Sequence, residues 1–464
     1  MKISSVKSKF VVSQMRLDGS FHLSDGLEVR KLMSKSPYGT TEIKDVSSNI
    51  YCPGIFKRNY VKSGIPFLGG GDIQKQDLDS GKYLREKNTP NYEVLQIKKG
   101  WSLVTCGGTI GDTVFANNLL AKCWISQHVM RVIPQNIKEG MLYAYLASKY
   151  GKLLLTTNTY GSVIPTLNAS NIANLPIPRF PVFFQQEVDN LVQEAARLRE
   201  KAADALEYAI SFFNTLFHVP FKDNCLGKVS SKEIMTSINK RFEASFHISE
   251  GKDIDKYIKE HYEWKSLGEV CSNISRPDIF KRYYVKNGIT FLGGADIFLA
   301  TPDSEKRLSK TKTENISQLV IKEGIILLPR SGTIGNVAWA HAGHAQKLAS
   351  EHVIRLLPND ILRAGYVYAF LASKYGKLLI QRYIFGSVIQ HVEPPHLKLI
   401  PVPIIDQKTM DDIHDKIMLY SSAMGKAIEF EQKAIHMVEQ EIEKWNKHLS
   451  STYKCNFLGA DNKQ

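Results

Sequence analysis

The chain has 464 residues, of which 43% are hydrophobic and 23% are charged, values that are ordinary for a globular protein. No apolar run reaches membrane-spanning length and the N-terminus lacks the apolar core of a signal sequence, so we expect a cytoplasmic protein. The formal net charge of +14 and the pI of about 9.2 favour a polyanionic partner, above all nucleic acid, over a merely basic protein.

The sequence contains an internal repeat of domain size. FKRNYVKSGIPFLGGGDI, at 56–73, returns 224 residues later (280 − 56) as FKRYYVKNGITFLGGADI, at 280–297. GGTIG, at 107–111, returns with the same offset as SGTIG, at 331–335. This period is too long for a solenoid or propeller unit and matches a whole domain. We therefore expect two tandem domains of the same kind.

Inside the first copy, short strand-like runs alternate with helical patterns. GIPFLGG, WSLVTC, DTVFAN and HVMRVIP are apolar runs punctuated by Gly or Asn, which is typical of strands. EGMLYAYLASKYGKLLL, at 139–155, has apolar residues at helical spacing and is predicted to be one amphipathic helix. The polar, Lys-rich stretch at 221–241 is predicted to be a connecting loop. The fold class is α+β, built from mixed α/β domains.

A long helix is predicted after each copy. Proline-rich segments at 175–181 and 400–404 form extended crossings into these helices, because proline disfavours helix for the residue before it. At 184–217, apolar residues alternate steps of four and three without interruption, which is a heptad seam. At 409–449 the seam has one stutter and the polar intruder Glu431. We expect the two helices to pair with each other; the alternative is that each packs only on its own domain.

The repeat and the helices together divide the chain into four parts. These are a first domain at 1–181, a central helix at 182–220, a second domain at 221–403, and a C-terminal helix and tail at 404–464.

The six cysteines do not form a metal-binding or repeated disulfide pattern. None lies in a CxxC pair, and no Cys/His cluster has zinc spacing. Cys106 and Cys123 align with Arg330 and Lys347 in the second copy, so no disulfide is repeated. We expect reduced, mostly structural thiols at all six positions, which are Cys52, Cys106, Cys123, Cys225, Cys271 and Cys455.

No catalytic set of residues is repeated. The chain lacks a phosphate-binding GxxxxGK[ST] loop, an HExxH motif, a zinc-deaminase signature and a glycine-rich loop for a methyl donor. PDSEKR, at 302–307, has nuclease-like carboxylates, but its counterpart at 78–83 is LDSGKY. We therefore expect no catalytic residue, cofactor or metal in this chain.

The repeated residues instead have the chemistry of binding. A basic and aromatic cluster suits DNA phosphates, which such groups hold without reading sequence; the alternative is a solvated surface turn. The cluster consists of Lys57, Arg58, Tyr60 and Lys62, repeated as Lys281, Arg282, Tyr284 and Lys286.

Two further repeated segments are candidates for DNA contact. Glycine lets the backbone approach a ligand closely, although a tight hairpin explains the glycine loops equally well. A repeated histidine is either a ligand-contacting group or a structural hydrogen-bonding group. The residues are Gly107, Thr109 and His128, with Ser331, Thr333 and His352 in the second copy.

Positions where the two copies differ inside a shared frame are candidate base-reading positions. Cys106 aligns with Arg330, and Gln127 aligns with Glu351. Arginine suits guanine, glutamine suits adenine, and glutamate accepts from cytosine. The segment 165–168 also differs from its counterpart, which begins at Gln390. At any single position, neutral drift is an equally good explanation.

In their order and duplication, these segments resemble the specificity subunit of type I restriction–modification enzymes. The resemblance covers essentially the whole chain. It is carried by the GGTIG and SGTIG loops, by two GSVI segments that precede the proline-rich exits, and by the two helices. The two copies are unusually alike for this family, which suggests related half-sites.

The resemblance implies a non-catalytic recognition subunit that acts in phage defence. Each target-recognition domain would read one half of a bipartite site in double-stranded DNA, and the helices would pair as an antiparallel coiled coil that spaces the domains. A pair of DNA methyltransferase subunits and the restriction (translocase) subunits would join the complex. S-adenosylmethionine, ATP and Mg would bind to those partners.

Three other readings remain at this point. A type IIB enzyme or another methylation-linked defence system would use a similar subunit. A self-sufficient nuclease–methylase would need a methyl-donor loop or carboxylate set that is missing here. A tandem adhesion protein, for example lectin-like, fits poorly with the basic charge and the heptad helices.

Overall fold

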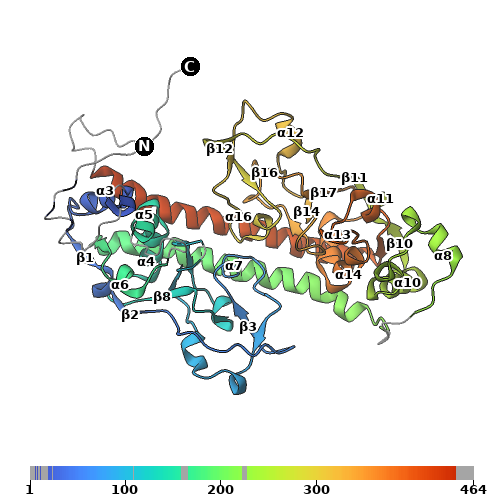
Figure 1. Ribbon diagram of the computed structural model, residues 1–464, viewed down its shortest axis with the longest axis horizontal. Helices are drawn as coiled ribbons and strands as arrows, with labels where there is room; N and C mark the ends of the chain where they lie inside the picture. Colours follow the sequence, from blue (N-terminus) through green and yellow to red (C-terminus); the bar gives the residue numbers. More distant parts are fainter. Residues whose placement is uncertain are drawn as a thin grey trace. The chain divides into compact units, whose positions relative to one another are not determined.

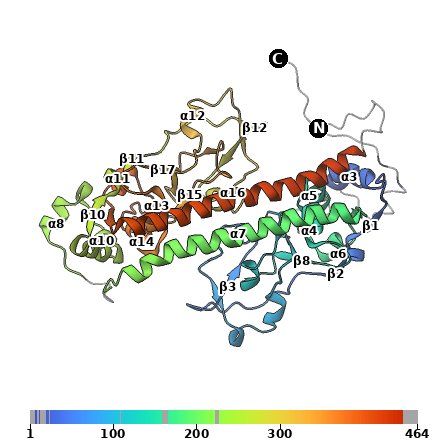
Figure 2. The same cartoon turned by 180° about the vertical axis from the view of Figure 1, so that it is seen from behind.

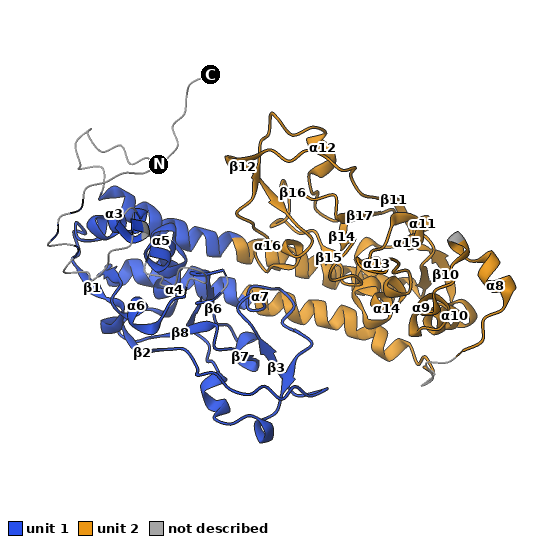
Figure 3. Ribbon diagram, viewed as in Figure 1, with its two compact units in different colours: residues 1–197, 429–464 blue, residues 198–428 orange. Residues whose placement is uncertain are grey.

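The computed structural model divides the chain into two compact units (Figure 3). Unit 1 comprises 1–197 with 429–464, and unit 2 comprises 198–428. The residues that the structure describes are 6, 8, 11, 19–22, 24–107, 109–157, 166–221 and 227–445.

The described residues of unit 1 form three small β-sheets. A four-stranded antiparallel sheet has the order β2-β8-β5-β6, and a three-stranded sheet has the order β4-β3-β7, in which β3 and β7 are parallel. β1 and β9 form an antiparallel pair. The strands are β1 (Thr40–Glu42), β2 (Ser47–Tyr51), β3 (Ile65–Leu68), β4 (Tyr83–Leu84), β5 (Ser102–Thr105), β6 (Thr113–Phe115), β7 (Trp124–Ile125), β8 (Val129–Pro134) and β9 (Pro176–Pro178).

The core of unit 1 lies between the four-stranded sheet and the helices. Val104 and Met130 of the sheet, Leu142 of α4, Val188 of α7 and Val438 of α16 belong to one buried apolar cluster. Figure 1 and Figure 2 both show α4 and α5 beside these parts of the two long helices. The helices are α2 (Gly19–His22), α3 (Asp25–Met33), η1 (Ile43–Val46), η2 (Glu86–Asn88), η3 (Tyr92–Leu95), η4 (Leu120–Lys122), α4 (Glu139–Ala147), α5 (Lys149–Thr157), α6 (Ala169–Ala173), the first part of α7 (Val182–Leu216) and the last part of α16 (Gln407–Lys444).

Unit 2 repeats the sheet topology of unit 1. Its sheets have the orders β11-β17-β14-β15, β13-β12-β16 and β10-β18, again with one parallel pair, between β12 and β16. The expectation of two tandem mixed α/β domains is therefore confirmed. The strands are β10 (Glu263–Ser266), β11 (Cys271–Ser275), β12 (Tyr284–Leu292), β13 (Arg307–Leu308), β14 (Ile326–Pro329), β15 (Ala338–Trp339), β16 (Leu348–Ala349), β17 (Val353–Pro358) and β18 (Pro401–Ile404).

Aromatic packing joins the long helices to the rest of unit 2. The Phe213 ring of α7 packs against the rings of Tyr366 and Phe370 of α13, with centroids 5.6 and 5.5 Å away. The Tyr208 hydroxyl donates to Asp412 of α16 at 2.9 Å. The remaining helices are α8 (Ser231–Thr236), η5 (Ile238–Lys240), α9 (Ala244–His247), α10 (Glu250–His261), α11 (Leu267–Val270), η6 (Asp296–Phe298), α12 (Ile316–Leu319), α13 (Ala364–Ala372), α14 (Lys374–Arg382) and α15 (Pro394–Leu397).

Both long helices occur where the heptad seams predict them. α7 has 35 residues and α16 has 38. The predicted end of the second helix, 446–449, lies outside the described residues. Glu431, the polar residue in the seam, accepts a hydrogen bond from the Tyr143 hydroxyl at 2.7 Å within unit 1. Among the described residues, no helix is long and apolar enough to cross a membrane.

The prediction of one continuous helix at 139–155 is wrong. The chain forms α4 and α5, which are separated by Ser148 in an extended conformation. The Ser148 hydroxyl accepts from the Gly151 amide at 3.1 Å, so it caps the second helix. A Cβ atom at Gly151 would lie 2.2 Å from the Tyr145 carbonyl oxygen, so glycine allows the sharp turn. α13 and α14 are divided in the same way at Ser373.

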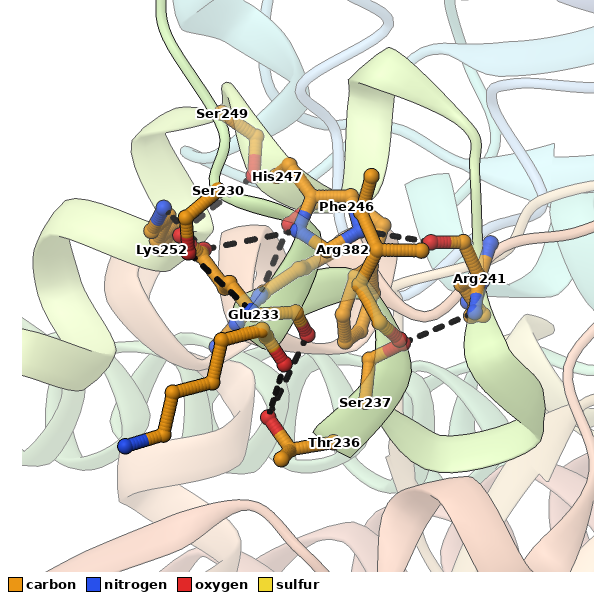
Figure 4. A network of polar contacts seen from close by, with 12 residues as sticks. Ser230, Glu233, Thr236, Ser237, Arg241, Phe246, His247, Ser249, Lys252 and Arg382 are labelled. Carbon is orange, nitrogen blue, oxygen red and sulfur yellow. Dashed lines mark hydrogen bonds and ion pairs between the residues drawn. The ribbon is translucent and has the colours of Figure 1, made fainter.

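The prediction of a connecting loop over all of 221–241 is also wrong, because this stretch contains α8 and η5. Ser230 caps α8 by accepting from the Glu233 amide at 3.1 Å. The Glu233 carboxylate accepts from Lys252 of α10, and the buried His247 contacts the Arg241 carbonyl oxygen at 2.7 Å (Figure 4). Arg241 in turn donates to the Ile384 carbonyl oxygen at 2.6 Å. This polar network fixes the segment to the body of unit 2.

Candidate nucleic-acid interface

In each unit, one edge of the four-stranded sheet gathers most of the predicted site residues. In unit 1, β2 and β5 end and β8 begins at this edge, because the antiparallel strands pair in register there. In unit 2, β11, β14 and β17 do the same. We call these segments, together with the start of β12 in unit 2, the loop edges; Tyr284 and Lys286 lie on that strand of the three-stranded sheet. The loop edge of unit 1 consists of 52–62, 106–107, 109–111, 126–128 and 166–168, and that of unit 2 of 276–286, 330–335, 350–352 and 390–393.

The loop edges share a backbone frame. The Cys106 amide donates to the His128 carbonyl oxygen at 2.9 Å, and the Cys106 carbonyl oxygen accepts from the Leu167 amide at 3.4 Å. In unit 2, the Arg330 amide donates to the His352 carbonyl oxygen at 2.7 Å, and the Arg330 carbonyl oxygen accepts from the Val392 amide at 3.0 Å. The same frame therefore presents different side chains in the two units.

In each unit, an arginine of the basic cluster contacts a residue that differs between the two copies. In unit 1, the Arg58 guanidinium donates to the Gln127 side-chain oxygen at 2.9 Å and lies 5.5 Å from the centroid of the Phe67 ring. In unit 2, Arg282 donates to Glu351 and lies 5.5 Å from the centroid of the Phe291 ring. The Glu351 side chain is only 6% exposed. The two sequence-predicted groups thus meet as an arginine–amide pair in unit 1 and as an arginine–carboxylate pair in unit 2.

Unit 2 has a second charged cluster at its loop edge. Arg276 donates from Nε to Glu393 at 3.0 Å, and Arg330 donates from Nε to the same carboxylate at 2.7 Å. Burial raises the pKa of the Glu393 carboxyl, but the hydrogen bonds from the two guanidinium groups outweigh burial and hold the pKa below its usual value. Glu393 is therefore ionised at neutral pH.

The corresponding positions of unit 1 are uncharged. Cys52 aligns with Arg276, and its sulfur atom lies 3.5 Å from that of Cys106. Asn168 aligns with Glu393 and caps α6 by accepting from the Asn171 amide at 2.8 Å. Within one backbone frame, two thiols and an amide replace two guanidinium groups and a carboxylate.

The cysteines of the described residues are free thiols. Burial raises the pKa of Cys123 to about 11 and that of Cys271 to about 12, so both are protonated at neutral pH. Cys225 and Cys455 lie outside the described residues. No cluster of three or more His, Cys, Asp or Glu side chains suited to a metal ion occurs among the residues that the structure describes.

Most other predicted residues lie at the surface of the loop edges. Gly107 and Ser331 are half-buried. Three predicted parts lie outside the described residues. They are Pro165, residue 108 of the first glycine loop, and the first GSVI segment at 161–164. The exposed residues are Lys57, Tyr60, Lys62, Thr109, His128, Lys281, Tyr284, Lys286, Thr333, His352 and Gln390.

Sequence reasoning assigned no role to a buried arginine beneath each loop edge. Arg131 is 0% exposed and donates to the carbonyl oxygens of Val129, at 2.6 Å, and Ser126, at 2.9 Å. It also donates to Ile125 of β7 and Leu95 of η3. Burial lowers its pKa to about 10, so the guanidinium stays charged at neutral pH. Arg355 makes the equivalent bonds to Val353, Ala349 and Leu319 in unit 2. The occurrence of arginine at the same place in both copies, Arg131 and Arg355, was the sequence signal that could have revealed this role.

Two exposed isoleucines were also missed. Ile55 is 91% exposed and Ile279 is 85% exposed, each just before the Lys–Arg pair of its unit. Arg276 was missed as well, although its alignment with Cys52 is a difference of the kind that marked Arg330.

Two units of one topology, each with a basic loop edge, define a duplicated mixed α/β protein. The family model described as the type I restriction modification DNA specificity domain matches residues 35–189 and 259–439. The chain belongs to this family and contains its domain twice.

Three solved structures that the chain matches have low sequence identity to it and low TM-scores. The S subunit of a type I restriction–modification system from M. genitalium is 13% identical, with a TM-score of 0.36, over 88% of this chain and 96% of that one. The HsdS subunit from Thermoanaerobacter tengcongensis is 14% identical, with a TM-score of 0.27, over 89% and 98%. A chain from a study of complex assembly and conformational transition of the type I R-M system is 15% identical, with a TM-score of 0.28, over 88% and 96%. Comparison with curated proteins gives no match.

Proposed function

We propose that this chain is the non-catalytic DNA-specificity subunit of a type I restriction–modification complex, in which each unit reads one half of a bipartite site. Family membership supports the role in DNA specificity. The observation that carries the proposal further is the duplicated loop edge, where one backbone frame presents Cys106 in unit 1 and Arg330 in unit 2. A symmetric scaffold with different side chains suits two half-sites of different sequence.

We assign the grip on the DNA backbone to the exposed basic residues of the loop edges. Lys57 and Lys62 in unit 1, and Lys281 and Lys286 in unit 2, are exposed and carry the charge that phosphates attract. Arg58 and Arg282 belong to the same grip, and the side chain of Gln127 or Glu351 holds each of them in a fixed orientation. On this proposal Glu351 acts mainly through Arg282, because its carboxylate is buried against that guanidinium.

We propose that α7 and α16 form an antiparallel coiled coil that sets the distance between the half-sites. Within unit 1, early α7 shares a core with late α16, as Val188 and Val438 show. Within unit 2, Tyr208 of late α7 contacts Asp412 and Lys416 of early α16. The opposite order of these contacts supports antiparallel pairing. Helices of 35 and 38 residues are about 50–60 Å long, enough to separate half-sites by about one 34 Å turn of DNA.

The partners follow from the type I assignment. We propose that methyltransferase subunits dock on the long helices and that restriction subunits complete a cytoplasmic complex. S-adenosylmethionine, ATP and Mg would bind to those subunits rather than to this chain. A type I system needs DNA specificity, methylation and restriction. The family that matches this chain is named for DNA specificity alone, so we assign methylation and restriction to the partners.

The direct test measures duplex binding by the chain in complex with its methyltransferase partner, using a pool of random duplexes. We expect enrichment of a bipartite sequence and affinity that falls steeply with salt. A complex that enriches no sequence would contradict the proposed function.

The phosphate grip predicts a change that does not depend on DNA sequence. Replacing Lys57 and Arg58 with alanine should weaken binding to all duplexes by a similar factor and should reduce the slope of log affinity against log salt by about two, since about one unit is lost per phosphate contact. The measurement is a salt titration on several duplexes. Replacing exposed Lys31 and Lys35 removes the same charge away from the loop edge and should leave the slope nearly unchanged. A loss confined to one base position would contradict the phosphate role.

A further inference from the structure

The loop edges differ most in charge at three aligned positions. Unit 2 has Arg276, Arg330 and Glu393, and both guanidinium groups donate to the one carboxylate. Arg276 follows β11, Arg330 follows β14, and Glu393 precedes α15, so three separate segments of the loop edge converge on this cluster. The arginine side chains are 27% and 22% exposed, which leaves each partly open to a ligand.

Helix capping does not explain Glu393. It occupies the N-cap position of α15, but its side chain makes no capping hydrogen bond. At the same place in unit 1, Asn168 does cap its helix. The carboxylate of Glu393 is instead directed at Arg276 and Arg330, so its position serves the two arginines.

The cluster has more hydrogen-bond donors and more positive charge than its carboxylate can satisfy. Each guanidinium has five N–H donors, whereas one carboxylate offers about four lone-pair sites. Two arginines and one glutamate also leave a net charge of one positive unit. A ligand that suits this arrangement presents acceptors and no competing donor. In the major groove, guanine presents N7 and O6 as two adjacent acceptors, whereas adenine presents one acceptor beside a donor.

We propose that Arg276 and Arg330, held in position by Glu393, form a guanine-reading site of unit 2. The corresponding positions of unit 1, Cys52 and Cys106, make no such contact, so the two half-sites differ at this point. Arg276 and Arg330 touch the base, and Glu393 is a positioning residue. The inference rests on the proposed function, since it names a base that unit 2 recognises.

Substituted DNA tests the guanine site with the unaltered protein. Once the preferred site of the complex with its methyltransferase partner is known, each guanine is replaced in turn by 7-deazaguanine, which lacks the N7 acceptor. We expect one substitution to weaken binding about five- to hundredfold, the range of a good arginine–guanine pair. If no 7-deazaguanine substitution changes the affinity, the proposal is overturned.

Variants then assign the sensitive guanine to this cluster. Arg330→Ala and Arg276→Ala should each reduce or remove the difference between guanine and 7-deazaguanine at that position and leave the other half-site unaffected. Glu393→Gln should reduce the same difference while the thermal melting of the complex stays close to that of the unaltered protein. A merely structural role would lower melting without changing the base preference, and equal weakening on every duplex would indicate a phosphate contact; either result rejects the proposal.

The two proposals fail in different ways. A complex without any sequence preference overturns the proposed function itself. A complex that enriches a bipartite site but is indifferent to 7-deazaguanine overturns only the guanine site. A cysteine control, Cys52→Ala in unit 1, should leave the sensitive guanine unchanged, and altered sensitivity there would contradict the assignment to unit 2.

Discussion

Replacing Arg131 with alanine is expected to lower the free energy of unfolding of unit 1 by about 3–5 kcal/mol, because the change leaves buried carbonyl oxygens without a donor and creates a cavity. Arg131 is fully buried and joins β8 to the segment before it, to β7 and to η3. Its loss therefore weakens the contact between two sheets as well as the support beneath the segment 126–128.

Urea denaturation and amide hydrogen exchange of β8 measure this effect. Arg355→Ala should have a similar effect on β17 in unit 2, because Arg355 makes three of the four equivalent bonds, to Val353, Leu319 and Ala349. The exposed Arg197 is the control, and its replacement should change stability by no more than about 0.5 kcal/mol. A destabilisation by Arg131→Ala as small as that of the control would show that the buried guanidinium does not hold the sheets together.

Lengthening both long helices by one heptad is expected to change the DNA sequence that the complex recognises. Seven residues inserted after Arg197 of α7 and seven after Ile428 of α16 preserve the heptad seam and add about 10 Å to each helix. We expect the same two half-sites to be methylated with a longer spacer, by up to about three base pairs at 3.4 Å per pair. Sequencing of methylated bases in cells that contain the variant and its partner reads the spacer directly.

An insertion of the same length elsewhere provides the control. Seven residues placed after Lys228, which lies outside both helices, lengthen the chain without lengthening either helix. This control should retain the original spacer. An unchanged spacer in the double-helix insertion, with both half-sites still methylated, would contradict the role of the helices as a ruler.

The sequence predicted the parts of the fold that arise from a regular spacing of residues, namely the domain repeat and the heptad seams. The repeat indicated two units of one topology, and the heptad seams located α7 and α16. The break at Ser148 escaped prediction, because apolar spacing continues across it and only the close approach at Gly151 reveals the turn. α8 was not predicted because the stretch 221–241 is polar and Lys-rich as a whole, and the capping role of Ser230 was not recognised in it.

The sequence indicated which residues to consider as site candidates, but it did not indicate which of them contact one another. Comparison of the copies singled out Gln127, Glu351 and Arg330, which the structure places at the loop edges. It did not reveal that Arg58 bonds to Gln127, since this pair is 69 residues apart and is brought together by the sheet. Nor did it reveal Glu393 as the shared partner of two arginines, because a carboxylate at an N-cap position ordinarily caps its helix.

The cluster of Arg276, Arg330 and Glu393 constrains how this protein can evolve a new target. Removing Glu393 alone would leave two arginines facing each other without a counter-charge, and placing a glutamate alone at the position of Asn168 would set a carboxylate beside two thiols. Most one-step routes between the two states therefore pass through an intermediate in which the base-reading side chains are no longer held in position. The three positions should change as a block, so that recognition at this point shifts in discrete jumps rather than by gradual drift.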